Sequence, residues 1–326
     1  MPSYMVVKIL DSRSVVFPST RVYGDVELRP YKSDTSYESE LLESSANQNR
    51  VDYNKYKFCS RVCTIVFAGS VEAALDIAED KFTTVLDLLS VNYALSLLDF
   101  SPVGYAKDLH SGEYTKLITN QSSLTQTYLV DAFCGQGFDD VNFILSLDND
   151  LADRYLKSLH WSRNAKRESN QQLRILFSWF SLEALLKEDE RDNISGIAKW
   201  FLGFPNSSGR NAIDPKILQA LNKDERYRSW NDVIAKKIDE IRIFRNDSVH
   251  SGFRSCDFST QELALYDKIT TLSSARCQHA VKVALMNKVQ TVSEFKEFVP
   301  TIFEGRQGLV NDVLNNIVFM LDKVME

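Results

Sequence analysis

The hydrophobic pattern of this 326-residue chain changes its period near residue 147, and this change constrains the fold more than any other feature. Before it, apolar and β-branched residues form short runs, such as residues 5–10 and 21–28, separated by Pro, Gly, Ser and Asp, as in strands joined by turns. After it, apolar residues recur every three or four positions, as in helices. We therefore predict an α+β domain over residues 1–147, followed by an all-α bundle.

Within the first domain, a helix is predicted after Ser70, which can serve as its N-cap, because apolar residues then recur at helical spacing as far as Leu89. The polar stretch of residues 33–54, rich in Ser, Glu and Asn, predicts a long loop. Further segments of this domain are predicted as strands, some of them alternatively as a short helix: residues 14–17, 58–67, 95–105, 116–118 and 125–133.

The second half of the chain predicts a helical domain over residues 148–290 and one or two closing helices over residues 291–326. Helical spacing of apolar residues marks four main helices. They are expected around residues 151–159, 173–184, 232–244 and 260–286.

Several classes of protein are disfavoured by composition. Apolar runs end well before the ~18–20 residues that a membrane span requires, and the N-terminus lacks the basic flank and cleavage site of a signal peptide. The chain has five cysteines, an odd number, and no two of them are separated by only two residues, as the cysteines of a zinc or redox motif would be. No Cys or carboxylate cluster accompanies the four histidines at metal-ligand spacing. We expect a cytoplasmic protein with no metal and no cofactor.

The net charge of −6 disfavours binding of nucleic acid through bulk electrostatics, but the charges are unevenly distributed. Residues 1–150 carry 12 Lys and Arg against 21 Asp and Glu, whereas residues 257–326 carry 7 against 9. Residues 151–256 carry 19 against 14. The middle third is therefore the only basic part of the chain, and it is where an anionic partner is expected.

An apolar helical face in this basic region ends in a cation. On a helix at about 100° per residue, the face that contains Ile234, Ile238 and Ile241 also contains Arg245. A cation at such a position is costly unless something requires it. The simplest structural interpretation is an arginine that extends to solvent at a helix C-terminus and complements the helix dipole.

Five residues after Arg245 comes His250, with Asn246, Asp247 and Ser248 between them. On an unbroken helix, positions five apart lie about 140° apart around the axis. Asn, Asp and Ser hydrogen-bond locally and favour helix ends, so we expect a bend that brings the two side chains into one site.

The preceding helix carries Trp179-Phe-Ser-Leu-Glu-Ala-Leu-Leu186, in which Glu183 lies beside the apolar stripe and within reach of Arg245. A helix with this sequence, a variable loop and then a helix ending in Arg245-Asn-x3-His250 resembles the HEPN domain, and is similar to its ApeA-like branch in prokaryotic antiviral and toxin proteins. The resemblance covers residues 148–290. It implies a HEPN-type bundle that cuts RNA without a metal, with two copies of the motif at a homodimer interface.

The resemblance assigns Arg245, Asn246 and His250 to the motif and Glu183 to its acidic helix position. The residue types suit transesterification by the ribose 2′-hydroxyl, because imidazole can act as acid or base near neutral pH and guanidinium can stabilise the phosphoryl oxygens. Candidate substrate-binding cations are Lys236, Lys237, Arg242 and Arg254. The architecture also suggests that the first domain senses a trigger ligand or protein.

Three alternatives remain open. Arg154 and His160 have the same spacing, but the sequence between them predicts a continuous helix. The helical domain is alternatively a non-catalytic scaffold that binds RNA, a nucleotide or a protein. The weakest alternative is a hydrolase in which His250 or His279 acts with one of two cysteines, Cys256 or Cys277, because no oxyanion-hole sequence accompanies these residues.

Overall fold

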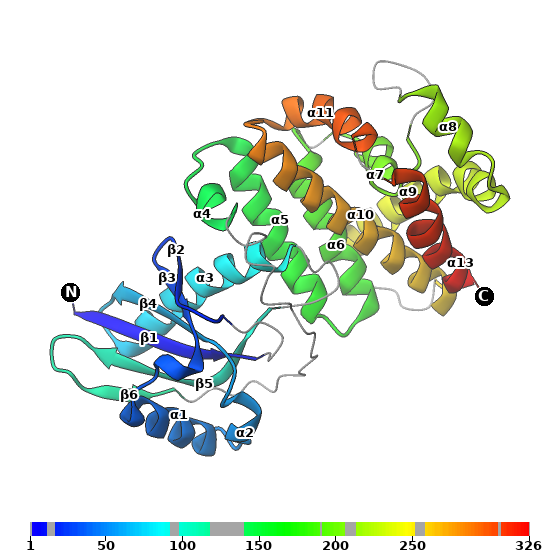
Figure 1. Ribbon diagram of the computed structural model, residues 1–326. Helices are drawn as coiled ribbons and strands as arrows, with labels where there is room; N and C mark the ends of the chain where they lie inside the picture. Colours follow the sequence, from blue (N-terminus) through cyan, green and yellow to red (C-terminus); the bar gives the residue numbers. More distant parts are fainter. Residues whose placement is uncertain are drawn as a thin grey trace. The chain divides into compact units, whose positions relative to one another are not determined.

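The computed structural model describes residues 2–11, 17–91, 98–117, 140–189, 191–205, 213–251, 258–305 and 308–325 (Figure 1). The chain divides into two compact units, Met1–Ser146 and Leu147–Glu326. The first contains an antiparallel sheet with helices and the second is helical, which confirms the predicted fold class. The division lies beside the predicted boundary at residue 147, and residues 291–326 belong to the second unit.

The sheet of the first unit has six strands in the order β2-β3-β4-β1-β5-β6, and all neighbours are antiparallel. The central strand β1 pairs with β4 on one side and with β5 on the other. Gly24, with φ +60°, forms the turn between β2 and β3. The strands are β1 (Ser3–Leu10), β2 (Arg21–Tyr23), β3 (Val26–Arg29), β4 (Arg61–Phe67), β5 (Phe100–Asp108) and β6 (Tyr114–Lys116).

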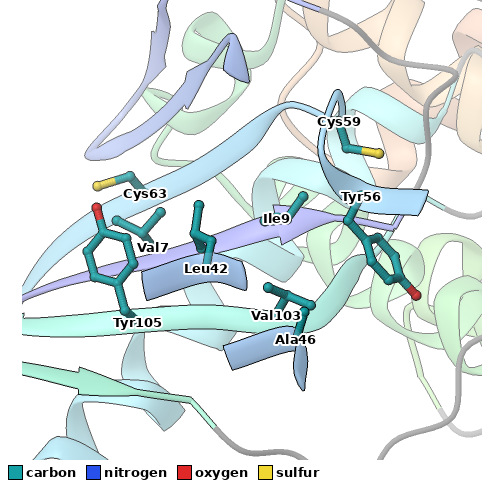
Figure 2. Close-up of a cluster of buried hydrophobic side chains, with 9 residues drawn as sticks. All are labelled: Val7, Ile9, Leu42, Ala46, Tyr56, Cys59, Cys63, Val103 and Tyr105. Atoms are coloured by element: carbon teal, nitrogen blue, oxygen red, sulfur yellow. The ribbon is translucent and has the colours of Figure 1, made fainter. Parts of the chain in front are cut away.

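Helices cover both faces of this sheet (Figure 1). On one face, Val7 and Ile9 of β1 pack with Leu42 and Ala46 of α1 (Ser36–Gln48), as Figure 2 shows. On the other face, Lys8 pairs with Glu79 of α3 (Val71–Ser90). Alternate residues of β1 therefore serve two different layers.

Helix α1 shows that the prediction of a loop over residues 33–54 was wrong. Thr35 accepts a hydrogen bond from the backbone N–H of Glu38, and the Glu38 carboxylate accepts one from the backbone N–H of Thr35. This capping box satisfies two donors that a helix start leaves open. Leu42 and Ala46 are then fully buried on one helix face. The short helix α2 (Tyr53–Tyr56) follows, and a 3-10 turn (Tyr31–Ser33) precedes α1.

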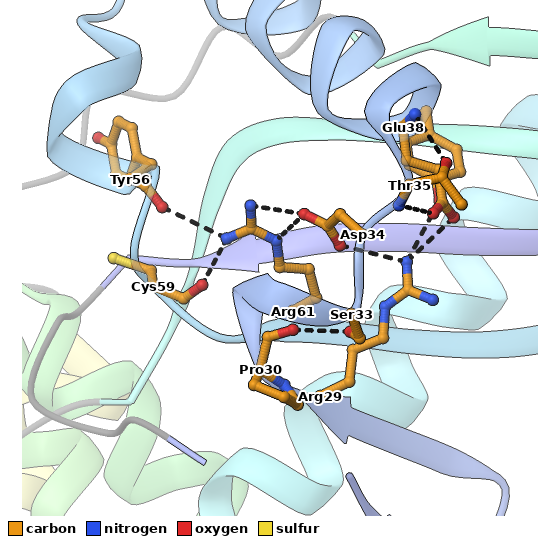
Figure 3. A network of polar contacts seen from close by, with 10 residues as sticks. Arg29, Pro30, Ser33, Asp34, Thr35, Glu38, Tyr56, Cys59 and Arg61 are labelled. Atoms are coloured by element: carbon orange, nitrogen blue, oxygen red, sulfur yellow. Dashed lines mark hydrogen bonds and ion pairs between the residues drawn. The ribbon is translucent and has the colours of Figure 1, made fainter. Parts of the chain in front are cut away.

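A buried network of charges lies beside the start of α1 (Figure 3). Arg61 of β4 donates to Asp34 through Nε at 2.7 Å and also to backbone oxygens of Tyr56 and Cys59. Arg29 donates to Glu38 at 3.2 Å. Arg61 and the Asp34 side chain are each 1% exposed. Because Arg61 of β4 binds the Asp34 carboxylate, the ion pair fixes the chain before α1 to the sheet.

Other predictions in this unit have mixed outcomes. The helix after Ser70 is confirmed as α3, with the Ser70 hydroxyl accepting from the backbone N–H of Ala73 at 3.3 Å. Strands β4, β5 and β6 confirm parts of the predicted segments 58–67, 95–105 and 116–118. The segment 125–133 and most of 14–17 lie outside the described residues. Helix α4 (Asp140–Leu145), which was not predicted, packs on α3.

The helical unit is built on α5 (Asp150–Arg167), α6 (Gln171–Leu186), α9 (Glu225–Ser251) and α10 (Thr260–Met286). These confirm the four predicted main helices. Short helices α7 (Ser195–Phe201) and α8 (Pro215–Leu221) come between α6 and α9, and the C-terminal part contains α11 (Val292–Glu304), α12 (Leu309–Asp312), a π-helix (Val313–Val318) and α13 (Phe319–Met325). None of the described helices has the length and apolar character needed to cross a bilayer.

A buried polar cluster joins three of these helices. The Ser181 hydroxyl of α6 lies 2.8 Å from those of Ser158 in α5 and Ser274 in α10. Gln278 of α10 donates to Ser158 and Ser181 at 3.1 and 3.0 Å. Small side chains let the helices approach closely, and the mutual hydrogen bonds remove the cost of burying polar atoms. This cluster fixes α6, and with it the position of Glu183.

Candidate functional site

The predicted apolar face of α9 is confirmed. Ile234, Ile238 and Ile241 are 0% exposed, and Phe244 is 2% exposed. Arg245 follows at the end of this buried face, with its side chain 21% exposed. The apolar face of α9 is therefore buried up to Phe244 and partly exposed at Arg245. The residue that ends this face, Arg245, carries a permanent positive charge.

Arg245 is bound by residues of α6, as the sequence predicted for Glu183. Arg245 Nη2 lies 2.8 Å from Glu183 Oε2, and its guanidinium carbon lies 5.5 Å from the centroid of the Phe180 ring. Nη1 donates to Asn246 Oδ1 at 3.1 Å. Within the described residues, the buried Nε of Arg245 has no hydrogen-bond partner. The guanidinium is thus held on several sides, while the side chain as a whole stays partly exposed.

Glu183 shares its charge between two cations. Its Oε1 lies 3.6 Å from Nζ of Lys187, one turn further along α6. The Glu183 side chain is 15% exposed and that of Lys187 is 24% exposed. The carboxylate therefore does not cancel the local positive charge, and a net cationic site remains around Arg245.

The expected bend between Arg245 and His250 is absent, and that prediction was wrong. Helix α9 runs without interruption through Ser251. On a continuous helix, these two positions lie about 140° apart around the axis and about 7.5 Å apart along it. Asn246 does not break the helix, because its side-chain oxygen accepts from Arg245. The position of the His250 side chain lies outside the described structure.

The proposed substrate-binding cations are matched by carboxylates on their own helix. Lys237 lies 2.8 Å and Lys236 3.9 Å from Glu240, while Arg242 Nε lies 3.6 Å from Asp239. The three described cations share two carboxylates, so one positive charge remains on this part of α9. Arg254 lies outside the described residues. A role for these four residues in binding RNA remains untested.

The competing pair Arg154 and His160 has local structural partners. Arg154 Nη1 donates to the backbone oxygen of Lys187 at 2.7 Å, and its Nε donates to Asp150 at 2.8 Å. Arg154 thus satisfies a carbonyl at the C-terminus of α6. His160 Nε2 lies 3.2 Å from Nδ2 of Asn164. This pair lies on one continuous helix, α5, as predicted.

The weaker Cys and His alternative loses support from the geometry. Cys277 is fully buried, and burial raises the pKa of its thiol well above the ordinary value. A thiol with a raised pKa is a poor nucleophile at neutral pH. Cys256 lies outside the described residues. Among the residues that are described, no three His, Cys, Asp or Glu side chains gather as a metal site would require.

Two participants in the site were missed in the sequence. Phe180 and Lys187 lie three residues before and four residues after Glu183, so all three share one side of α6. The spacing of Phe180, Glu183 and Lys187 in the sequence indicates that they share one helix side. Such spacing of apolar and charged residues is common in any amphipathic helix, however, so it does not single these residues out. Only the three-dimensional structure shows that Phe180 of α6 faces Arg245 of α9.

Comparison of the chain with protein-family models, curated proteins and solved structures finds no match. The resemblance to the HEPN domain thus rests on the motif and on the helices that carry it.

Proposed function

We propose that this protein is a metal-independent endoribonuclease of the HEPN type, cytoplasmic and active as a homodimer. The single observation that carries the proposal is the placement of Arg245, which stands at the end of a buried helix face, is oriented by Glu183 at 2.8 Å and has a side chain that is 21% exposed. A donor oriented in this way suits the non-bridging oxygens of a phosphodiester.

In the proposed mechanism, His250 exchanges a proton with the ribose 2′-hydroxyl or the 5′ leaving oxygen, and Arg245 stabilises the charge that develops on the phosphoryl group. Asn246 and Glu183 act by positioning Arg245, since both contact its guanidinium. Because positions 245 and 250 lie about 140° apart around one continuous helix, we propose that the Arg245 of one copy meets the His250 of another. This is the physical reason for proposing a homodimer.

The biological setting that we propose is prokaryotic antiviral defence or toxin-like growth arrest, with the α+β unit responding to a trigger. It follows only from the motif resemblance and the division into two units.

The test is cleavage of total RNA in EDTA by the wild type, His250→Ala and the control His160→Ala. Loss of the acid–base group should reduce cleavage by about 10²–10⁴-fold, whereas His160→Ala should retain activity. Equal activity of all three proteins would overturn the catalytic proposal. Sedimentation of wild type and variants checks that they share one oligomeric state.

The second candidate is a non-catalytic scaffold for RNA. Arg245, which Glu183 orients at 2.8 Å, is a better anchor for a single phosphate than Lys236, whose side chain is 80% exposed. RNA binding that is weakened by Arg245→Ala, without cleavage by the wild type under any tested condition, would favour this alternative.

A further inference from the structure

A cavity of about 410 Å³ lies in the helical unit where α7, α10 and α11 meet, away from every residue of the proposed nuclease site. This volume falls at the lower end of the range of small-molecule sites, roughly 300–1,000 Å³. A ligand of one or two fused rings therefore fits it, whereas a helix or an RNA strand does not.

The walls of the cavity are mainly aromatic and aliphatic. Trp200 of α7 and Phe303 of α11 meet edge to face with ring centroids 5.3 Å apart, and both are largely buried. Val283 and Val299 line the cavity from α10 and α11. A flat apolar ring placed against these residues would leave water and gain edge-to-face contacts, so the walls favour a planar aromatic ligand.

Three polar side chains line the described part of the cavity: Arg276, His279 and Thr301. Arg276 and His279 line it three residues apart on α10, on the same helix side. Arg276 Nη2 also pairs with Asp312 of α12 at 2.7 Å, which orients the guanidinium. Because a guanidinium carries five donors, an ion pair through one nitrogen is compatible with a second acceptor. Arg276 is the one permanently charged side chain among the described lining residues, which include no Asp or Glu, so an anionic group is the complement that we infer.

We propose that this cavity binds a small planar aromatic acid, with its ring against Trp200 and Phe303 and its carboxylate at Arg276 and His279. The inference is independent of the nuclease proposal, because its test measures binding and not RNA cleavage.

The test is calorimetric titration of the full-length protein with indole-3-acetate and with 3-methylindole, which has the same ring system without the carboxylate. The acid should bind saturably and about tenfold or more tightly than the neutral molecule, because it gains a charge-assisted hydrogen bond. Equal affinity for both, or no binding of either up to about 1 mM, overturns the proposal.

Variants locate the binding. Val283→Phe fills the cavity and should abolish binding of both ligands, whereas the matched change Val233→Phe, on an exposed face of α9, should leave binding unchanged. If Val283→Phe unfolds the protein, Thr301→Trp at the exposed rim narrows the entrance instead and should have the same effect. His279→Gln should weaken only the acid. Binding that persists when the cavity is filled or its entrance narrowed overturns the assignment.

Discussion

Two arginines, one in each unit, stand in comparable clusters and differ in what they leave available. Arg61 is 1% exposed, and it donates both to the Asp34 carboxylate and to backbone oxygens (Figure 3). Arg245 has a side chain that is 21% exposed, pairs with Glu183 and has a buried Nε without a partner in the described structure. The guanidinium of Arg61 is fully used in contacts within the fold. The guanidinium of Arg245 is also oriented by such contacts, but its side chain is partly exposed and could bind a ligand.

The difference teaches how to separate a structural cation from a functional one. Removing a buried, saturated cation leaves its partners charged and desolvated, so stability should fall. Removing a partly exposed cation leaves a carboxylate that water and Lys187 can still solvate, so stability should change little. Stability and activity should therefore respond in opposite ways at the two sites.

The largest expected effect on stability is that of Arg61→Ala. We expect it to lower the free energy of unfolding by about 3–5 kcal/mol, because Asp34 would remain buried without its partner. Urea denaturation measures this loss. The control is Lys81→Ala, which removes an exposed ion pair with Asp25 and should cost less than about 1 kcal/mol. Similar losses in the two variants would show that the network is not structural.

At the second site, Arg245→Ala should reduce RNA cleavage by about 10²–10³-fold while lowering the free energy of unfolding by only about 1 kcal/mol. The matched control is Arg154→Ala, which removes the hydrogen bond to the Lys187 backbone and should leave cleavage intact. Cleavage assays and urea denaturation on the same preparations separate the two effects. A loss of stability as large as that of Arg61→Ala would make Arg245 a structural residue.

The smallest effect concerns pH. Burial alone would raise the pKa of Glu38, but hydrogen bonds from Thr35 and Tyr105 and the charge of Arg29 lower it from 4.5 to about 2. Because the folded pKa lies below the unfolded one, the stabilisation is complete above about pH 4.5 and is lost as the pH falls toward 2. Glu38→Gln should thus cost on the order of 2 kcal/mol at neutral pH.

Measurement of both proteins by urea denaturation between pH 7 and pH 2.5 checks this expectation. The difference between wild type and Glu38→Gln should shrink as the pH falls. A difference that stays constant across this range would show that the charge of Glu38 is not what stabilises the network.

The sequence predicted the fold class and the buried face of α9 because both follow from periodicity in short stretches. It also predicted that Glu183 and Arg245 would be neighbours, because both lie at the edges of apolar helix faces. The missed helix α1 had a recognisable signal in the sequence, because Thr35 is followed three residues later by Glu38, as in a capping box. Most of its residues are polar, however, and its narrow buried face is evident only from its packing on the sheet.

The wrong bend had a different cause. An Asn side chain favours a helix end when it hydrogen-bonds to nearby backbone groups in place of the helical hydrogen bonds. Here the side-chain oxygen of Asn246 accepts a hydrogen bond from Arg245 instead, so it does not compete for the backbone of α9. The cavity lined by Trp200, Arg276 and Phe303 was beyond prediction, because it forms where α7 meets α10 and α11, which lie far from it in the sequence, and each helix alone has an ordinary amphipathic pattern.

Helix α9 has a mechanical consequence. Its 27 residues form one continuous helix about 40 Å long. The backbone positions of Arg245 and His250 therefore keep a constant angle around the helix axis and a constant distance along it. No hinge lies between these two positions in α9, so bending of the backbone between them does not change the distance between the two positions. For the composite site that we propose, control would act by bringing two such helices together or by holding them apart.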